Sequence, residues 1–282
     1  MSGTLRFDTL VSGLAPITGA PLPGGEQPSW SPLTHTLIFG ERDAVLVDPP
    51  ITAAQTETLA DWIAAHERRL IAIYITHAHA DHWLGTARLL ERFPEARVYA
   101  GEAATARIFA DTADGTPGAL WATLFPEQLP TPIRFPVEPA PAAGIELEGE
   151  RLHSIAVGHS DMDDTTVLHV PALDLVVGGD IVYNNVHLYL AEARNGGFEA
   201  WHRALDAVEA LNPAATIAGH KDASRDDSPV NVDETRRYLR DAEDILGTAT
   251  TRLEFFTALT ARYPERVNAY TTWLSALRLF DR

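Results

Sequence analysis

A run of β-branched and aromatic residues from Ile71 to Ile75 leads directly into a segment with four metal-binding side chains within six residues. The run is typical of a strand that is buried on both faces of a sheet. The following segment is expected to form a loop at the carboxyl end of this strand. Its imidazole and carboxylate groups are ligand types that zinc and similar ions prefer, and they belong to His77, His79, Asp81 and His82. The alternative is a solvated polar turn.

Strand and helix patterns alternate on both sides of this segment, which favours an α/β layer structure. The first half predicts strands at residues 36–39, 44–48, 71–75 and 97–100, and helices at 52–69, 84–93 and 102–110. The second half repeats the pattern, with strands at 152–159, 165–170, 173–180 and 215–220 and a helix at 197–211.

Two other regions depart from this alternation. Residues 111–144 are rich in proline and predict a long insert, which either overhangs the site as a lid or forms a stiff surface connection. Residues 230–282 have helical periodicity and either cover the pocket or build a homodimer contact. We therefore predict one domain at 1–229 that carries the site, and a helical extension at 230–282 that packs on it.

The composition limits the classes of function. The chain has no cysteine, so every protein ligand to a metal must offer nitrogen or oxygen. Its formal net charge of −17 disfavours nucleic acid and anionic membranes as partners. No uninterrupted apolar stretch is long enough to span a bilayer, and the amino terminus lacks a basic segment followed by an apolar one. We expect a cytoplasmic protein that acts on a small molecule.

Three more candidate ligands follow apolar strands, where open α/β sheets gather their functional groups: His159, Asp180 and His220. Together with the first cluster they make five imidazoles and two carboxylates. Such a set could hold two divalent ions, and with a bridging hydroxide it would carry roughly one positive charge. A centre of this kind suits the polarisation of a carbonyl group.

The pattern from His77 to His82, followed by His159, Asp180 and His220, resembles that of the metallo-beta-lactamase-fold hydrolases over about residues 35–221. This resemblance implies a four-layer αββα sandwich and a dinuclear centre. It implies that His77, His79 and His159 hold one ion, that Asp81, His82 and His220 hold the other, and that Asp180 bridges them. Zn²⁺ is the expected ion, with iron or manganese as alternatives.

Two features concern the branch of the family. The absence of cysteine and the bridging aspartate make the chain more similar to the glyoxalase II and lactonase branches than to cysteine-using β-lactamases. The acid-rich loop from Gly158 to Asp164 departs from the threonine-proline-glycine-histidine-threonine run of several branches. Its acids are expected either to hydrogen-bond ligand histidines or to cap the next strand.

The expected reaction is hydrolysis of a lactone, ester, thioester or amide by a metal-bridging hydroxide. Asp81 is a candidate for proton transfer to the leaving group. Tyr183 lies three residues after Asp180, as does a tyrosine of the acyl-homoserine lactonase branch that contacts the substrate carbonyl, so the resemblance suggests an oxyanion role. The alternative is a packed aromatic residue. His187 is a further candidate for substrate contact.

Several alternatives remain open at this stage. Asp48, at the end of a strand, either orients a ligand histidine or is an ordinary loop carboxylate. The same ligand set could serve an iron-dependent dioxygenase or a flavin-partnered oxidoreductase of the superfamily. A non-catalytic binding protein stabilised by metal belongs to a different class of function.

Overall fold

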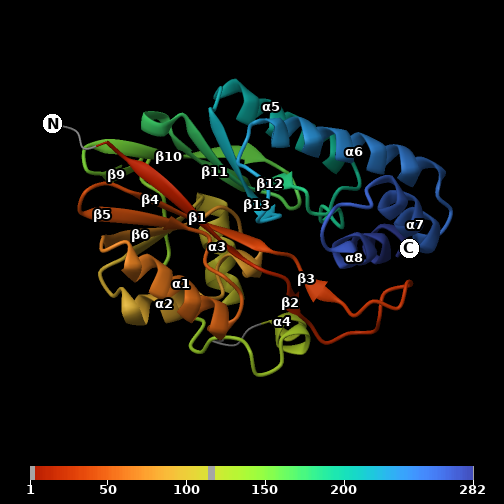
Figure 1. The fold of residues 1–282 in the computed structure, drawn as a ribbon, viewed down its shortest axis with the longest axis horizontal. Helices are drawn as coiled ribbons and strands as arrows, with labels where there is room; N and C mark the ends of the chain where they lie inside the picture. The colour runs from red at the N-terminus through yellow and green to blue at the C-terminus, as the bar shows by residue number, and fades with distance from the viewer. Residues whose placement is uncertain (1–3, 114–117, 282) are drawn as a thin grey trace.

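Two sheets stack face to face in the computed structural model, which describes residues 4–113 and 118–281 (Figure 1). The first sheet has six strands in the order β1-β4-β5-β6-β7-β8. Its strands are β1 (Arg6–Ser12), β4 (Leu33–Phe39), β5 (Asp43–Val47), β6 (Arg69–Ile75), β7 (Arg97–Ala100) and β8 (Glu138–Pro139). The pairs from β5 to β8 are parallel, so the carboxyl ends of these strands share one edge of the sheet.

The second sheet has five strands in the order β13-β12-β11-β10-β9. Its strands are β9 (Ile145–Leu147), β10 (Glu150–Gly158), β11 (Thr165–Val170), β12 (Leu175–Asn184) and β13 (Ala215–Lys221). Only β12 and β13 are parallel within it. A separate short pair, β2 (Ala15–Pro16) and β3 (Ser29–Trp30), lies near the C-terminal helices.

Helices cover the outer face of each sheet and complete four layers (Figure 1). The helices on the side of the first sheet are α1 (Ala53–Ala65), α2 (Thr86–Arg92) and α3 (Glu102–Asp111). On the side of the second sheet lie α5 (Gly197–Ala210) and α6 (Val230–Thr248). The αββα architecture predicted from the sequence is confirmed.

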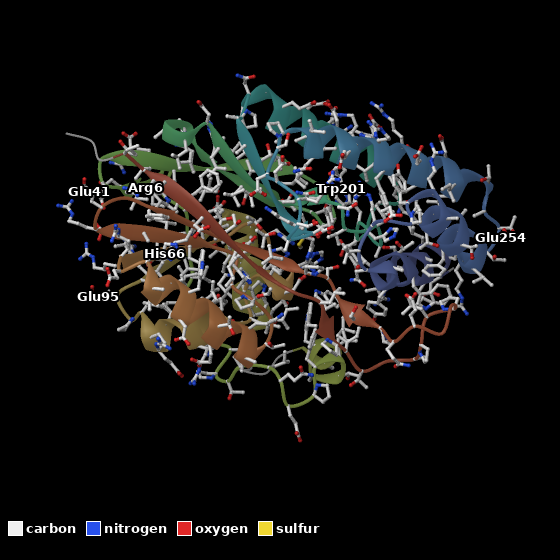
Figure 2. All side chains as sticks on the ribbon, viewed as in Figure 1. Arg6, Glu41, His66, Glu95, Trp201 and Glu254 are labelled. Carbon is white, nitrogen blue, oxygen red and sulfur yellow. The ribbon has the colours of Figure 1, made fainter. Side chains whose placement is uncertain are left out.

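Local sequence explains where these helices begin and how they pack. Thr52 caps α1 through a capping box, in which its hydroxyl accepts from the Gln55 amide and the Gln55 side chain accepts from the Thr52 amide. On α5 the periodic apolar side chains face the second sheet, and the Trp201 indole donates to the Ile181 carbonyl over 2.9 Å. Glu41, Glu95 and Glu254 lie at the periphery, whereas Trp201 lies inside (Figure 2).

The space between the sheets is filled by apolar side chains from both. Val45 and Tyr74 of the first sheet belong to one buried cluster with Val177 and Ile217 of the second. The Tyr74 hydroxyl is also 2.7 Å from Thr166 Oγ1 on the opposite sheet. Strands with buried faces on both sides explain why their sequences are almost continuously apolar.

The C-terminal segment forms α6, α7 (Arg252–Arg262) and α8 (Ala269–Phe280). Helix α6 packs against α5 and β12, and α8 packs against α7 and β3. The segment therefore packs on the sandwich, while its division into a separate domain at residue 230 stays a prediction. None of the helices within residues 4–113 and 118–281 is long and apolar enough to cross a membrane.

Most observed boundaries differ from the predicted ones by a few residues, and two differences concern the site. Strand β12 begins at Leu175 rather than at 173 and extends to Asn184, because Pro171–Leu173 forms a 3-10 turn and Asp174 adopts a left-handed conformation with φ 47°. The predicted insert at 111–144 includes α4 (Ala119–Leu124) and β8. Its residues 114–117 lie outside the described residues.

Candidate metal centre

Four segments place their polar side chains at one end of the sandwich. They are the loop after β6, the loop after β10, and the last parts of β12 and β13. The structure brings six of the seven predicted ligands together in three overlapping groups, each with its ligand atoms within 4.8 Å of one another: His77 with His82 and Asp180, Asp81 with His82 and His220, and His77 with His79 and Asp161. Asp161 was not predicted, and His159 belongs to none of these groups of described residues.

We call Asp81, His82 and His220 the His220 subsite. His220 Nε2 lies 3.5 Å from Asp81 Oδ2, and His82 Nε2 lies 3.8 Å from the same oxygen. Asp180 stands beside this subsite, with Oδ1 3.2 Å from His82 Nε2 and Oδ2 3.1 Å from His220 Nε2. All four side chains are buried, so their charges face one another with little screening by water.

Hydrogen bonds fix the direction of the three side chains in the His220 subsite. His82 Nδ1 donates to Asp48 Oδ2 over 2.9 Å, and His220 Nδ1 donates to the Pro32 carbonyl over 2.7 Å. Both rings therefore direct Nε2 at the subsite. The Trp30 indole donates to Asp81 Oδ2 over 2.9 Å. Partners of this kind set the tautomer and orientation of metal-binding histidines.

Asp48 holds both ends of the ligand-bearing loop after β6. Its Oδ1 accepts from the Thr76 amide and its Oδ2 accepts from the Thr76 hydroxyl, each over 2.8 Å. Because the Thr76 hydroxyl proton is used in this way, His77 Nδ1 donates to Thr76 Oγ1 over 3.0 Å and keeps Nε2 free as a ligand atom. The interpretation of Asp48 as an acceptor that orients a histidine is confirmed by its bond to His82.

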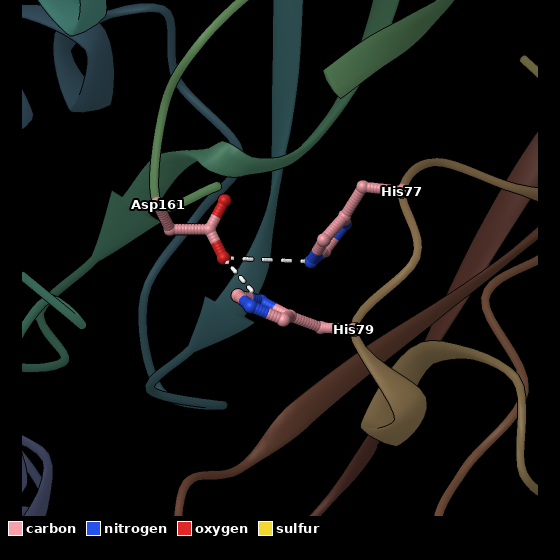
Figure 3. Close-up of side chains that lie close together, drawn as sticks. All are labelled: His77, His79 and Asp161. Atoms are coloured by element: carbon pink, nitrogen blue, oxygen red, sulfur yellow. Dashed lines mark ion pairs between the residues drawn. The ribbon is translucent and has the colours of Figure 1, made fainter. Parts of the chain in front are cut away.

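We call His77, His79 and Asp161 the Asp161 subsite. One carboxylate oxygen, Asp161 Oδ2, faces both rings, at 2.6 Å from His79 Nδ1 and 3.5 Å from His77 Nε2 (Figure 3). Asp161 comes from the loop after β10 and is fully buried, whereas the His79 side chain is 21% exposed. Ser160 Oγ donates to the other carboxylate oxygen over 2.8 Å.

His159 lies apart from this subsite. Its Nδ1 is 2.7 Å from Asp163 Oδ1, so one acid of the loop does hydrogen-bond a predicted ligand histidine. Its Nε2 lies near the start of α5, where a Cβ on Gly197 would come within 2.8 Å of it. The structure thus places Asp161, rather than His159, opposite His77 and His79.

Several ligand atoms are buried without a hydrogen-bond partner. They are His77 Nε2, His82 Nε2, Asp161 Oδ2 and Asp180 Oδ1. Buried polar atoms are normally paired, because leaving one without a partner costs about 1–3 kcal/mol. Cations placed in the groups to which these atoms belong would satisfy them, and the nitrogen and oxygen donors fit divalent ions of the zinc, iron or manganese type.

The charges of the site compensate one another when no cation is considered. Burial lowers the pKa of His77 to about 4. Burial also acts to lower the pKa of His220 and His79, but Asp180 and Asp161 respectively outweigh it and raise each pKa to about 10. For Asp180, burial acts to raise the pKa, yet His220 and His82 hold it well below its usual value. The carboxylates therefore stay negatively charged and favour positive charge between them, which is also what attracts a cation.

Two glycines permit the close approach of Asp180 to the other ligands. Gly219, directly before His220, lies against Asp180 Oδ1, so a Cβ at this position would clash with that oxygen. Gly179 has φ +51°, and a Cβ there would lie 2.8 Å from the Thr76 Cβ. A side chain at either position would displace β12 or β13 from the ligand loop.

A cavity of about 250 Å³ opens beside the ligands. His79, Asp81, Asp180 and His220 line its polar side. Its remaining wall combines aromatic, small polar and basic side chains, including Trp30, Trp121, Tyr189, Tyr270, Thr271, Arg107 and Arg278. The predicted insert contributes to the cavity wall through α4, and the C-terminal segment contributes through α8, while a lid and a homodimer contact stay predictions.

Tyr183 and His187 have different positions relative to the cavity. Tyr183 is among the lining residues and is fully buried, and its hydroxyl donates to Asp180 Oδ2 over 2.5 Å. Burial and the neighbouring Asp180 raise its pKa well above the usual value, so this hydroxyl keeps its proton. His187 lies away from the cavity lining, with Nδ1 2.8 Å from the Tyr238 hydroxyl. The prediction that His187 contacts substrate is therefore wrong.

The family model of the metallo-beta-lactamase superfamily matches residues 34–220. The chain belongs to the metallo-beta-lactamase superfamily. The match encloses every residue of both subsites, and the C-terminal helices lie beyond it.

Curated relatives match only a short part of this superfamily member. A hydroxyacylglutathione hydrolase from Parasynechococcus marenigrum (strain WH8102) is 42% identical over 66 residues, which are 23% of this chain and 25% of the relative. A hydroxyacylglutathione hydrolase from Francisella tularensis subsp. novicida (strain U112) is 38% identical over 64 residues, 23% of this chain and 24% of the relative. The chain thus spans about a quarter of the length of these relatives.

Solved structures agree with the fold over most of the chain. A metallo-beta-lactamase family protein from Thermus thermophilus superposes with a TM-score of 0.61 and 20% identity, covering 94% of this chain and 92% of that one. A metallo-beta-lactamase from Pontibacter korlensis gives a TM-score of 0.58 and 18% identity, covering 83% of this chain and 100% of that one. These likenesses show a shared fold.

The sequence offered Asp161 only as one of the loop acids that could contact a histidine and not as a candidate ligand, and it held no indication of Trp30. Asp161 follows His159 by two residues within an acid-rich loop, and this richness in acids was the one available signal. Trp30 has no such signal, because it reaches Asp81 from a short strand 51 residues away in the chain.

Proposed function

We propose that this protein is a dinuclear metal-dependent hydrolase that cleaves a carbonyl substrate. The observation that carries the proposal is the set of buried ligand atoms without partners beside an accessible cavity. A purely structural polar cluster would be expected to pair these atoms internally. The arrangement instead leaves nitrogen and oxygen atoms directed at common points between the carboxylates.

The residues of the chain have separate tasks in this proposal. His77, His79 and Asp161 would hold one ion, Asp81, His82 and His220 the other, and Asp180 lies between the two groups. Bound divalent ions would supply a water of lowered pKa and polarise the substrate carbonyl. Asp81, whose Oδ2 is fixed by Trp30, is placed to carry a proton towards the leaving group.

Tyr183 is proposed to assist at the substrate carbonyl oxygen. Its hydroxyl keeps its proton and already donates to Asp180, within the cavity lining. To donate to substrate it must exchange the carboxylate acceptor for the developing oxyanion, which is a short rotation of one O–H bond. A neutral donor of this type stabilises negative charge in the transition state.

The cavity supports a small-molecule substrate. Its aromatic wall suits an apolar acyl group, and its size is slightly below the usual range for drug-sized ligands. A lactone, ester, thioester or amide meets the chemical requirement. The hydroxyacylglutathione hydrolases among the relatives add support for a thioester, although their matched segments amount to only about a quarter of their length.

The test combines elemental analysis of the purified chain with a screen of lactones, glutathione thioesters and β-lactams. We expect bound divalent metal, hydrolysis of at least one substrate class, and loss of that hydrolysis after chelation with recovery on adding metal back. Hydrolysis that is indifferent to chelation would contradict the proposal. Metal-dependent melting of the fold without activity on the panel would favour a non-catalytic protein.

A second candidate function is an iron-dependent dioxygenase. The specific observation is the Asp161 subsite, in which two imidazoles and one carboxylate face a common point, the ligand type of non-haem iron oxygenases. Anaerobic purification followed by iron analysis and oxygen-uptake measurements separates the two functions. Oxygen uptake that depends on bound iron, without hydrolysis on the panel, would replace the hydrolase proposal.

A further inference from the structure

We propose that Asp161, in place of His159, is the third protein ligand of the ion held by His77 and His79. The inference rests on the proposed metal-binding function and deepens it. It differs from the assignment that resemblance to the superfamily implies, in which three imidazoles hold this ion. The difference replaces a neutral ligand by an anionic one.

The first argument is direction. Asp161 Oδ2 is the atom that faces both His77 Nε2 and His79 Nδ1, and the two histidine rings come from the opposite loop (Figure 3). His77 Nδ1 is already bonded to Thr76, so Nε2 is the free atom of that ring. The three free atoms therefore converge from two segments that are far apart in the sequence.

The second argument is the state of the Asp161 carboxylate. The side chain is fully buried, its Oδ1 accepts from Ser160, and its Oδ2 has no hydrogen-bond partner despite standing 2.6 Å from His79 Nδ1. Oδ2 therefore stands between two imidazole nitrogens, His79 Nδ1 and His77 Nε2, without a donor aligned on it. A buried carboxylate oxygen without an aligned donor is costly, and a cation bound to Oδ2 would supply the missing partner.

The third argument is the position of His159. Asp163 Oδ1 accepts from its Nδ1, and its Nε2 is turned towards Gly197 at the start of α5. Although His159 Nε2 is also buried without a partner, it forms no group with His77 and His79 among the described ligand atoms. His159 is therefore assigned to holding the loop after β10 against α5.

The chemical consequence is a ligand set with three carboxylates, Asp81, Asp161 and Asp180, instead of two. One more negative charge lowers the net positive charge of the loaded centre by one. Carboxylate ligands suit harder ions such as Mn²⁺ better than imidazoles do. The Asp161 subsite is therefore expected to discriminate less strongly between Zn²⁺ and Mn²⁺ than a three-histidine subsite would.

The test uses the metal-free full chain titrated with Zn²⁺ alone, in competition with a chromophoric chelator. The variants are Asp161→Asn and His159→Gln, each of which keeps the approximate size and an oxygen or nitrogen of the original side chain. We expect Asp161→Asn to weaken the binding of one of two ions by at least about tenfold. Loss of a residue that only hydrogen-bonds a metal ligand already costs this much, and loss of the ligand itself should cost no less. His159→Gln is expected to leave both affinities within about twofold.

The opposite ranking, or equal losses in the two variants, would overturn the inference. A crystal structure of the zinc-loaded wild-type chain decides the question even if Asp161→Asn fails to fold. It should place Asp161 Oδ2 about 2.0–2.2 Å from the ion. A zinc-loaded structure with His159 Nε2 at that distance and Asp161 remote would contradict it. Two bound ions and hydrolysis with that second geometry would refute this inference alone, whereas a wild-type chain that binds no ion would refute the proposed function as well.

Discussion

The two subsites differ in how firmly their ligands are held before any ion binds. In the His220 subsite, each of the three ligands has a hydrogen bond from or to a residue of the surrounding fold, namely Asp48, Pro32 and Trp30. In the Asp161 subsite, His77 and Asp161 have such bonds, to Thr76 and from Ser160 respectively, but the His79 side chain is 21% exposed and its ring nitrogens face the carboxylates of Asp161 and Glu192. Fixed ligands lose less freedom on binding, so the first ion is expected to enter the His220 subsite.

Asp180 lies beside both subsites, because its carboxylate forms a group with His77 of one and His82 of the other. Removing it in Asp180→Ala should abolish metal-dependent hydrolysis, because it leaves His82 and His220 without their strongest counter-charge and removes the carboxylate between the ions. Steady-state rates on the best substrate of the panel measure this effect. The exposed acid Asp61 gives a matched control, and Asp61→Ala should keep full activity.

The contact between Gly219 and Asp180 tests whether the packing of β13 on β12 determines the position of Asp180. Gly219→Ala introduces a methyl group against Asp180 Oδ1 and should reduce the free energy of unfolding by about 1–3 kcal/mol. Metal binding at the His220 subsite should weaken at the same time. Chemical denaturation and metal titration measure the two effects. Gly247→Ala, where a Cβ meets nothing within 4 Å, is the control.

The outer hydrogen bonds give the most specific test of the difference between the subsites. Asp48→Asn replaces the acceptor of His82 Nδ1 and should weaken the tighter ion by about 10–100-fold. Because Asp48 also accepts from Thr76, which contacts His77, a smaller loss is expected at the Asp161 subsite. Ser160→Ala removes the hydrogen bond that Ser160 donates to Asp161 Oδ1 and should weaken the other ion by less than about tenfold. Competition titrations with Zn²⁺ resolve both ions. Equal effects of the two variants would remove the distinction between a firmly held and a loosely held subsite.

A smaller effect concerns His187, which lies away from the metal site and makes the stability of the fold depend on pH. Burial lowers the pKa of His187 to about 3, whereas an unfolded histidine titrates near its ordinary value of 6.5. The unfolded chain therefore binds the extra proton first, so this stabilising contribution is present above pH 6.5 and is lost progressively as the pH falls towards 3. The loss is at most about 1.4 kcal/mol per pH unit.

Denaturation of the metal-free chain between about pH 7 and 5 measures the contribution of His187. The slope of the unfolding free energy against pH reports the number of protons that the chain takes up on unfolding. His187→Gln should lower that number by about one near pH 5. An unchanged slope would show that this histidine is not buried in its neutral form. Arg266, which also lowers the pKa of His187, must be left unaltered in the comparison.

The fold and most of the ligands were predictable because their signals are local. The spacing from His77 to His82 fixes four side chains on one loop, and Asp180 and His220 each lie near the end of an apolar strand. The parallel pairing of β12 with β13 then brings Asp180 and His220 together. The strand pattern was sufficient for Asp180 and His220 because both residues belong to the extended backbone of β12 and β13.

The remaining features depend on how distant segments meet. His159 and Asp161 stand two residues apart in one loop, and the sequence does not determine which of them turns towards His77. That choice depends on the bond between His159 and Asp163 and on the approach of α5. The cavity wall likewise required α4 and α8 to converge on β3, a contact with no sequence periodicity of its own.

Counting the ions bound by the chain tests the central claim most directly. The metal-free protein is equilibrated with Zn²⁺ by dialysis, and bound metal is measured by elemental analysis in the wild type and in Asp180→Ala. A dinuclear centre predicts two equivalents of bound Zn²⁺ per wild-type chain and a reduced number in Asp180→Ala. One equivalent or fewer in the wild type, or the same number in both proteins, would contradict a dinuclear centre built around Asp180.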